Sequence, residues 1–173
     1  MSTNHLPLIH YVDRFEGNWP ANSLCDIDAL GYCFITAGPA WADSLMALRD
    51  RLVRFVCLKP SVSERASDKS KPSSTHLAAA SQAKRSIHPG DQLGPFRVYA
   101  KTTDSLLLGA DDRHLNFRVI LQTAQHPDTS SHATTFSVTT QVQFNNTLGR
   151  LYFTLIMPFH KQIVKATVKG MEG

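Results

Sequence analysis

The sequence has few cysteines and no long apolar run. Its 173 residues include three cysteines, Cys25, Cys33 and Cys57, an odd number with no CxxC pair. This predicts reduced thiols in a core rather than a disulfide framework. No window approaches the roughly 18 uninterrupted apolar residues of a membrane span, and residues 1–8 lack a basic segment followed by an apolar one. We therefore expect a cytoplasmic protein with no membrane partner.

Concentrated positive charge is also missing. The net charge is +4, yet the lysines and arginines are scattered and no basic run is interleaved with aromatic residues, so we expect no nucleic-acid partner. The eight histidines form no HxxxH, HxH or Cys/His pair, which predicts no metal site. Glycine-rich phosphate loops and a nucleophile elbow are absent as well, and we expect no cofactor.

What the sequence does have is the composition of a globular protein, with 42% hydrophobic and 18% charged residues. A chain of this length buries roughly two thirds of the surface that is exposed when it is unfolded, so it needs no disulfide or metal ion to fold. Residues 60–89 differ, because they hold eight serines, three prolines and few large apolar side chains. We expect a single domain over residues 1–173 with a flexible Ser/Pro-rich insertion at about 60–89.

The first half of the chain predicts one strand followed by two helices. Residues 10–15 alternate moderately, as in a short strand. Ser23 is the expected N-cap of a short helix that breaks near Gly31. The clearest helix starts at Pro39. Its apolar residues at helical spacing are Trp41, Leu45, Leu48, Leu52 and Phe55.

After Gly90 the apolar period drops to two. The alternation predicts strands near residues 96–100, 105–109, 114–124, 136–144 and 151–157. Consecutive strands joined by short turns form an antiparallel meander. At Pro158 the period changes again, and an apolar helical face runs on to Gly170.

A one-layer meander must cover its apolar face, and the predicted helices are the available cover. The predicted fold class is therefore α+β, a curved antiparallel β-sheet wrapped around a C-terminal helix, with two helices after the first strand. His160 follows Pro158 closely, and we expect it to bond a free backbone group at the start of the last helix.

A row of polar residues marks the strand that starts near residue 112. Strand alternation places Asp112, His114 and Arg118 on one side, opposite the apolar residues Phe117 and Val119. If that side lines a cavity, His114 exchanges protons near neutral pH, Asp112 orients its imidazole and Arg118 holds an anionic group. If it faces water, the row is an ordinary sheet surface.

The space between sheet and helices is a second candidate site. Pockets for small molecules are mostly apolar with a few polar groups, so the partner predicted here is a small apolar molecule. The alternative is a filled core. The predicted lining consists of Trp41, Leu45, Phe117, Val119, Val138, Phe153, Phe159 and Ile163.

Three parts of the chain resemble one known family. The first part is Asp112–Val119. The second combines Gly149–Tyr152 with Ile156–Val164, and the third combines Pro39–Trp41 with Leu48–Asp50. In this order they resemble the bacterial domain-of-unknown-function family 2867, over nearly the whole chain except the insertion. The resemblance implies a helix-grip fold similar to the polyketide cyclase and START-like superfamily, without an established activity. Asn116 stands where the family pattern has Asp, so a mechanism that needs a carboxylate there lacks it.

These observations leave three functions open. The first is a helix-grip module that binds a small apolar molecule between sheet and helices. The second is an enzyme of cyclase, dehydratase or isomerase type that uses His114, Asp112 and Arg118. The third is an interaction module that docks a protein partner through its exposed sheet or its serine-rich segment.

Overall fold

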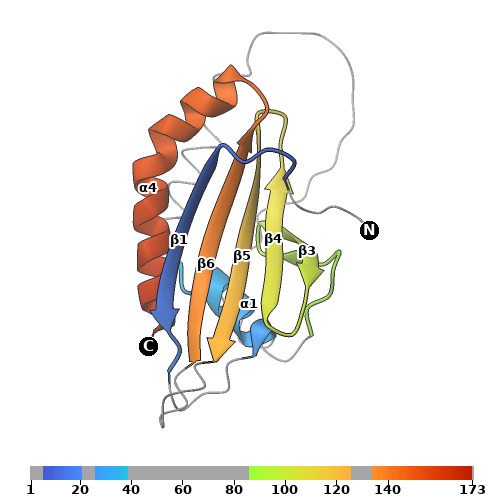
Figure 1. The fold of residues 1–173 in the computed structure, drawn as a ribbon, viewed down its shortest axis with the longest axis vertical. Coiled ribbons are helices and arrows are strands. Elements are labelled where there is room, and N and C mark those ends of the chain that lie inside the picture. The colour runs from blue at the N-terminus through green and yellow to red at the C-terminus, as the bar shows by residue number, and fades with distance from the viewer. Residues whose placement is uncertain (1–5, 21–25, 39–85, 126–133, 173) are drawn as a thin grey trace, which may run out of the picture.

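The structure is a computed structural model, and it describes residues 6–20, 26–38, 86–125 and 134–172. Figure 1 shows one sheet with a long helix, α4, beside its first strand. The elements are β1 (Tyr11–Asn18), α1 (Ile27–Thr36), β2 (Gln92–Leu93), β3 (Phe96–Lys101), β4 (Ser105–Asp111), β5 (Leu115–Gln125), β6 (Thr134–Phe144) and α4 (Thr147–Met171).

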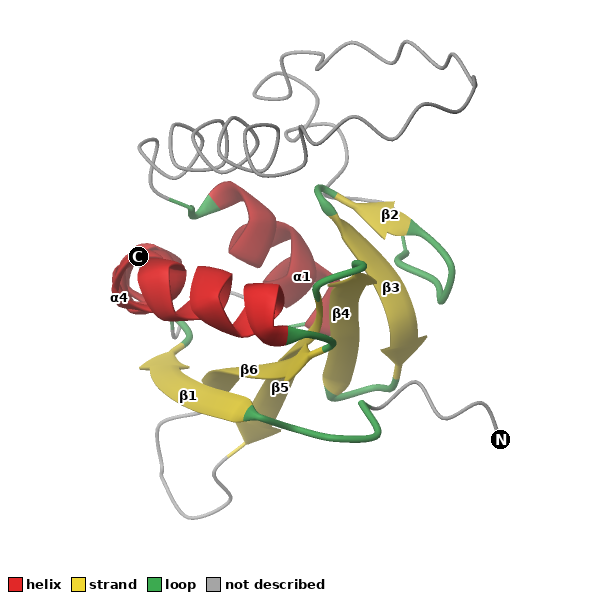
Figure 2. Cartoon of the chain, turned by 90° about the horizontal axis from the view of Figure 1, so that it is seen from above, coloured by secondary structure: helices red, strands yellow, loops and turns green. Residues whose placement is uncertain are grey.

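The sheet has six strands in the order β1-β6-β5-β4-β3-β2, and every neighbouring pair is antiparallel. It is curved, and α1 and α4 both cover the same face, as Figure 2 shows from above. This confirms the predicted fold class of a curved antiparallel sheet packed on a C-terminal helix. Strand β1 joins the sheet at its far edge, next to the last strand rather than next to β2.

Alternation along β5 and β6 sorts their side chains onto two faces, as the sequence predicts. Phe117 pairs across the strands with Val142, and Leu121 pairs with Val138. All four face the helices, and the last three are buried. The residues between them, such as Arg118, face the outer side of the sheet. The apolar face therefore forms the core that the helices cover.

Helix α1 does not break at Gly31, so that part of the prediction is wrong. Gly31 is buried inside the helix, where an added Cβ would lie 2.8 Å from Leu106 Cδ2 and 3.0 Å from Ile87 Cδ1. The glycine lets the helix approach the sheet closely rather than ending it. The predicted cap, Ser23, lies outside the described residues, and Asp26 occupies the N-cap position without a side-chain bond.

The strand predicted at residues 151–157 is also wrong, because these residues belong to α4. The helix begins at Thr147, and the Asn146 side chain caps it by accepting a hydrogen bond from the Gly149 amide at 2.9 Å. Pro158, expected to start the last helix, lies inside it. The alternating residues 151–157 instead divide between the buried side of α4, at Phe153, and its exposed side.

Two predicted features lie largely or wholly outside the described residues. The second helix, with its start at Pro39, lies entirely outside them. Of the insertion at about 60–89, the structure describes residues 86–89, where the Ile87 side chain is buried in the core between α1 and the sheet. Among the cysteines, only Cys33 is described, and it is a half-buried free thiol whose pKa burial raises.

Within the described ranges, no helix is both long enough and apolar enough to cross a membrane.

Candidate functional site

The three predicted catalytic residues make separate sets of contacts. Asp112 and His114 lie in the turn between β4 and β5, and Arg118 lies within β5 on the outer face. Arg118 Nη1 donates to Asp111 Oδ1 at 2.7 Å, and Nη2 donates to Asp111 Oδ2 at 3.3 Å. The guanidinium is therefore engaged by Asp111 of the chain itself, whereas we expected it to hold an anionic group of a ligand.

Tyr99 completes this outer cluster. Its ring lies 3.9 Å from the Arg118 guanidinium carbon, and its hydroxyl donates to Asp111 Oδ2 at 2.7 Å. Burial alone raises the pKa of the Asp111 carboxyl, but the bonds from Arg118 and Tyr99 outweigh burial and hold it below its usual value. Arg118 is only 6% exposed. The cluster is an ion pair on the outer face of the sheet in which Arg118 is enclosed and Asp111 remains partly exposed.

His114 serves to hold the β4–β5 turn against the start of α4. Its Nδ1 lies 3.1 Å from Asn146 Nδ2, and the same amide group donates to the Arg113 carbonyl at 3.1 Å. The neighbouring Asn145 side chain donates to the Asp112 carbonyl at 2.8 Å. A Cβ at Gly149 would collide with the His114 carbonyl group, so a glycine is needed there. These contacts hold the β4–β5 turn against the start of α4.

The predicted apolar lining is divided by the structure. Val119, Val138 and Phe153 are buried, and Phe117 packs against the core. Ile163 is half-buried, whereas Phe159 is exposed on the outer side of α4. Trp41 and Leu45 lie outside the described residues. Val119, Val138 and Phe117 belong to a packed cluster of side chains that the sheet, α1 and α4 enclose.

His160 takes part in a polar cluster under α4. Its Nε2 lies 3.1 Å from Asp13 Oδ2, and the Tyr11 hydroxyl donates to the same oxygen at 2.7 Å. Burial raises the pKa of Asp13, but the bonds from His160 and Tyr11 outweigh it and lower the pKa below its usual value. The expected backbone bond at a helix start is wrong, because His160 sits in mid-helix and binds a carboxylate.

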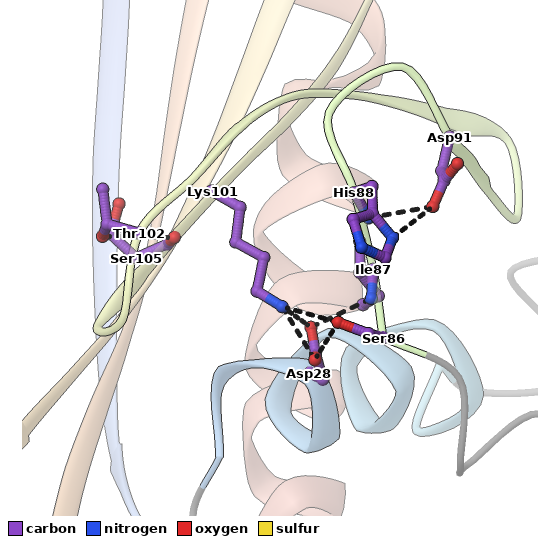
Figure 3. A network of polar contacts seen from close by, with 8 residues as sticks. All are labelled: Asp28, Ser86, Ile87, His88, Asp91, Lys101, Thr102 and Ser105. Carbon is purple, nitrogen blue, oxygen red and sulfur yellow. Dashed lines mark hydrogen bonds and ion pairs between the residues drawn. The ribbon is translucent and has the colours of Figure 1, made fainter.

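A third cluster joins α1 to the sheet and borders open space. Lys101 Nζ lies 2.6 Å from Asp28 Oδ1 and donates to Asp28 Oδ2 at 2.7 Å. The Ile87 amide donates to Asp28 Oδ1 at 3.3 Å, and the Ser86 hydroxyl donates to Oδ2 at 3.4 Å. Figure 3 shows the Lys101 and Ser86 side chains and the Ile87 backbone amide converging on Asp28.

A β-bulge explains why Lys101 points inward. Val98 pairs with Leu108, and the next pair joins Ala100 to Leu107, which leaves Tyr99 as the extra residue. The bulge reverses the alternation, so Tyr99 faces the outer side while Lys101, two residues later, faces α1. Asp28 is one of the first residues of α1, where the helix dipole favours a carboxylate.

The Asp28–Lys101 pair lies beside a hollow of about 430 Å³ between α1 and the β3–β4 turn. The two side chains are 17% and 20% exposed, so water reaches both but does not surround them. The hollow is lined by Asp26, Ile27, Ser86, Ile87, His88, Pro89, Lys101, Thr102 and Thr103. It combines the Lys101 cation, the Asp26 carboxylate, the His88 imidazole and hydroxyl groups with two isoleucines that are almost fully buried.

A smaller hollow of about 230 Å³ lies where β6 passes into α4. It is lined by Phe144, Asn145, Asn146, Thr147 and Arg150. The two asparagine side chains already bond the β4–β5 turn. We therefore take the larger hollow, with its ion pair, as the candidate site.

The sequence signal for this site is faint. Lys101 directly follows the strand predicted at residues 96–100, and Asp28 lies 73 residues away in the chain. Only the register shift at Tyr99 turns the lysine toward the helix. No described group of three or more His, Cys, Asp or Glu side chains is arranged to hold a metal ion.

Comparison with known proteins gives one match. No curated protein matches the chain, and no solved structure matches it. A family model described as "Protein of unknown function (DUF2867)" matches residues 5–167, which is nearly the whole chain. The chain therefore belongs to this family of unknown function.

Proposed function

We propose that this chain is a helix-grip module, similar to the START-like superfamily, that binds a small molecule in the hollow between α1 and the β3–β4 turn. The observation that carries the proposal is the Asp28–Lys101 pair, held at 2.6 Å beside that open space. The proposal keeps the small-molecule hypothesis and moves the site from the middle of the core to its border.

The size and lining of the hollow support a small ligand. The hollow is shallow and largely open to solvent, and its volume of about 430 Å³ falls in the range of roughly 300–1,000 Å³ that is usual for small-molecule pockets. Ile27 and Ile87 line the hollow but are almost fully buried, and Thr102 and Thr103 supply hydroxyl groups at the β3–β4 turn. A small ligand with one or two hydrogen-bonding groups fits this mixture.

The charges favour an uncharged ligand. Lys101 and Asp28 neutralise each other, since the ammonium group donates to Asp28 Oδ2 and lies 2.6 Å from Oδ1. It also reaches the Ser86 hydroxyl at 3.5 Å, which is a weak bond that a ligand oxygen replaces without loss. A carbonyl or hydroxyl oxygen is the expected partner of Lys101.

The enzyme hypothesis receives less support from the geometry. Arg118 is enclosed by Asp111 and Tyr99, and His114 is bonded to Asn146. Neither residue borders the larger hollow.

We also place the protein in the cytoplasm as part of this proposal, which the free thiol of Cys33 supports.

Native mass spectrometry of freshly purified protein tests the proposal. We expect an added mass of a small molecule on the wild-type chain. The Thr103→Trp variant fills the hollow from its exposed rim and leaves Asp28 and Lys101 in place, so it should lose that mass. Arg113→Trp, at an exposed turn position outside the hollow, is the matched control and should keep it. A wild-type chain that carries no added mass, or a Thr103→Trp variant that retains it, would contradict the proposal.

A further inference from the structure

Strand β1 leaves one side of its backbone open. It stands at the end of the strand order and pairs with β6 on one side only. The Trp19 amide bonds the Thr134 carbonyl, so in this register the odd-numbered residues of β1 bond β6. The amides of Val12, Arg14 and Glu16 therefore point away from the sheet, and the next one, at Asn18, donates to Glu172 Oε1 at 3.1 Å.

This edge carries little of the protection that edge strands usually have. It is eight residues long, contains no proline, and exposes the Val12 side chain. The two charges on its outer face, Arg14 and Glu16, pair with each other at 2.9 Å and cancel, while the third charged residue, Asp13, faces α4 and meets His160. The outer face of this edge is thus neutral, and no proline interrupts it as a template for another strand.

The charge pattern selects the partner strand. If a second copy of β1 pairs with the first in antiparallel fashion, Arg14 of each copy lies opposite Glu16 of the other in one register. That register pairs residues whose amides face outward, and it forms two ion pairs across the symmetry axis. A shift by two residues would set Arg14 against Arg14, which is unfavourable. The sequence of β1 is therefore complementary to itself.

Helix α4 adds an apolar stripe on the same side of the molecule. Both figures place α4 next to β1, at the edge of the sheet that β1 forms. Leu151 and Leu155 are 68% and 64% exposed, and Leu148 and Phe159 extend the same helix face. Such a row of exposed apolar residues on a helix marks an interaction surface.

We propose that two copies of this chain associate through their β1 edges, so that the two sheets become continuous and the two α4 stripes pack beside each other. The edge strands set the register and direction, and the leucines supply the apolar area that a strand pair alone lacks. This dimer goes beyond the proposed ligand site, which lies at the opposite end of the strand order, near β3 and β4.

Charge reversal tests the register by sedimentation velocity at tens of micromolar protein. The wild type should be a dimer, and Arg14→Glu alone or Glu16→Arg alone should raise the dissociation constant by about tenfold or more. Mixing the two variants should restore dimers, because each copy then faces opposite charges, and the double swap R14E/E16R should dimerise by itself. Arg113→Glu, an exposed reversal in the β4–β5 turn, is the matched control and should leave the dimer intact.

The stripe is tested separately with the double variant L151S/L155S. It should also weaken the dimer, whereas K161S/K165S, which changes two exposed residues further along α4, should not. A monomeric wild type would overturn the proposal, and so would normal dimerisation of the Arg14→Glu or Glu16→Arg single variant. If the monomeric wild type also sediments with vesicles of phosphatidylcholine and phosphatidylserine, the stripe belongs to a lipid surface and the proposal is equally wrong.

Discussion

Two carboxylate–cation pairs in this chain depend on neighbouring parts of β3 and differ in how fully the protein surrounds the cation, with the Arg118 side chain 7% and the Lys101 side chain 20% exposed. On the outer face, Asp111 receives both guanidinium nitrogens of Arg118 and the Tyr99 hydroxyl. On the helix side, Lys101 meets Asp28 with an ammonium group at the border of a hollow. Tyr99 and Lys101 are only two residues apart, and the bulge sends them to opposite faces.

The difference separates a structural pair from a candidate binding pair. Arg118 also donates to the Phe117 carbonyl at 2.9 Å and lies against an aromatic ring, so its donors are engaged by the protein itself. Lys101 has one donor in a weak contact of 3.5 Å, next to space that a small molecule can occupy. Similar chemistry thus serves stability in one place and, in our proposal, recognition in the other.

The largest change in the free energy of unfolding should come from a substitution that fills the space occupied by the Arg118 side chain. Gly109 lies opposite Arg118, and an added Cβ would lie 2.9 Å from Arg118 Cδ and would collide with the Phe117 carbonyl oxygen. Gly109→Ala should therefore lower the free energy of unfolding by about 3 kcal/mol in urea denaturation. Gly38→Ala, where nothing lies within 4 Å of the new Cβ, should change it by less than about 0.5 kcal/mol. Equal effects of the two substitutions would show that the outer cluster is not tightly packed.

Removing either cation should destabilise the chain less, and by unequal amounts. Arg118→Met breaks a pair in which the arginine is buried but the Asp111 side chain is 49% exposed, so we expect a loss of about 2 kcal/mol. Lys101→Met should lower the stability by about 1 kcal/mol, because Asp28 keeps the Ile87 amide and the Ser86 hydroxyl as donors. Chemical denaturation of both variants measures the difference. A larger loss for Lys101→Met would reverse our assignment of the structural pair.

The smallest expected effect is the pH dependence of the stability that Asp111 contributes. The pKa of Asp111 is lower in the folded chain than its ordinary value of about 3.9, so its charge stabilises the fold above that pH. This contribution is lost as the pH falls from about 3.9 through the lowered folded value. The wild type should be more stable than Asp111→Asn at pH 6, and the gap should shrink toward pH 3. A gap that is constant in thermal melts over this range would mean that the ionised carboxylate adds nothing.

Much of the sheet could be predicted because its pattern and its environment agree. β5 and β6 are paired on both sides and covered on one face, so alternation there reports burial directly. The predicted strand at residues 151–157 failed for the opposite reason. Leu151 and Leu155 are apolar yet exposed on α4, and together with the buried Phe153 they imitate a strand. When a helix has apolar residues on two faces, hydrophobic periodicity does not distinguish it from a strand.

The candidate site depends on features that local sequence does not encode. Lys101 faces α1 only because Tyr99 is an extra residue in β3, and Asp28 reaches it from 73 residues away. Likewise, Asp13 and His160 are separated by 147 residues and meet only when α4 packs on β1. Pairs of this kind follow from the packing of elements rather than from spacing within one element.

Comparison of Lys101→Met with Arg118→Met by native mass spectrometry tests the central claim most directly. Both variants lose one cation from an ion pair, and only Lys101 lines the hollow. If the hollow binds a small molecule, Lys101→Met should lose the added mass carried by the wild type, and Arg118→Met should retain it despite its larger loss of stability. Retention by Lys101→Met together with loss by Arg118→Met would contradict the account.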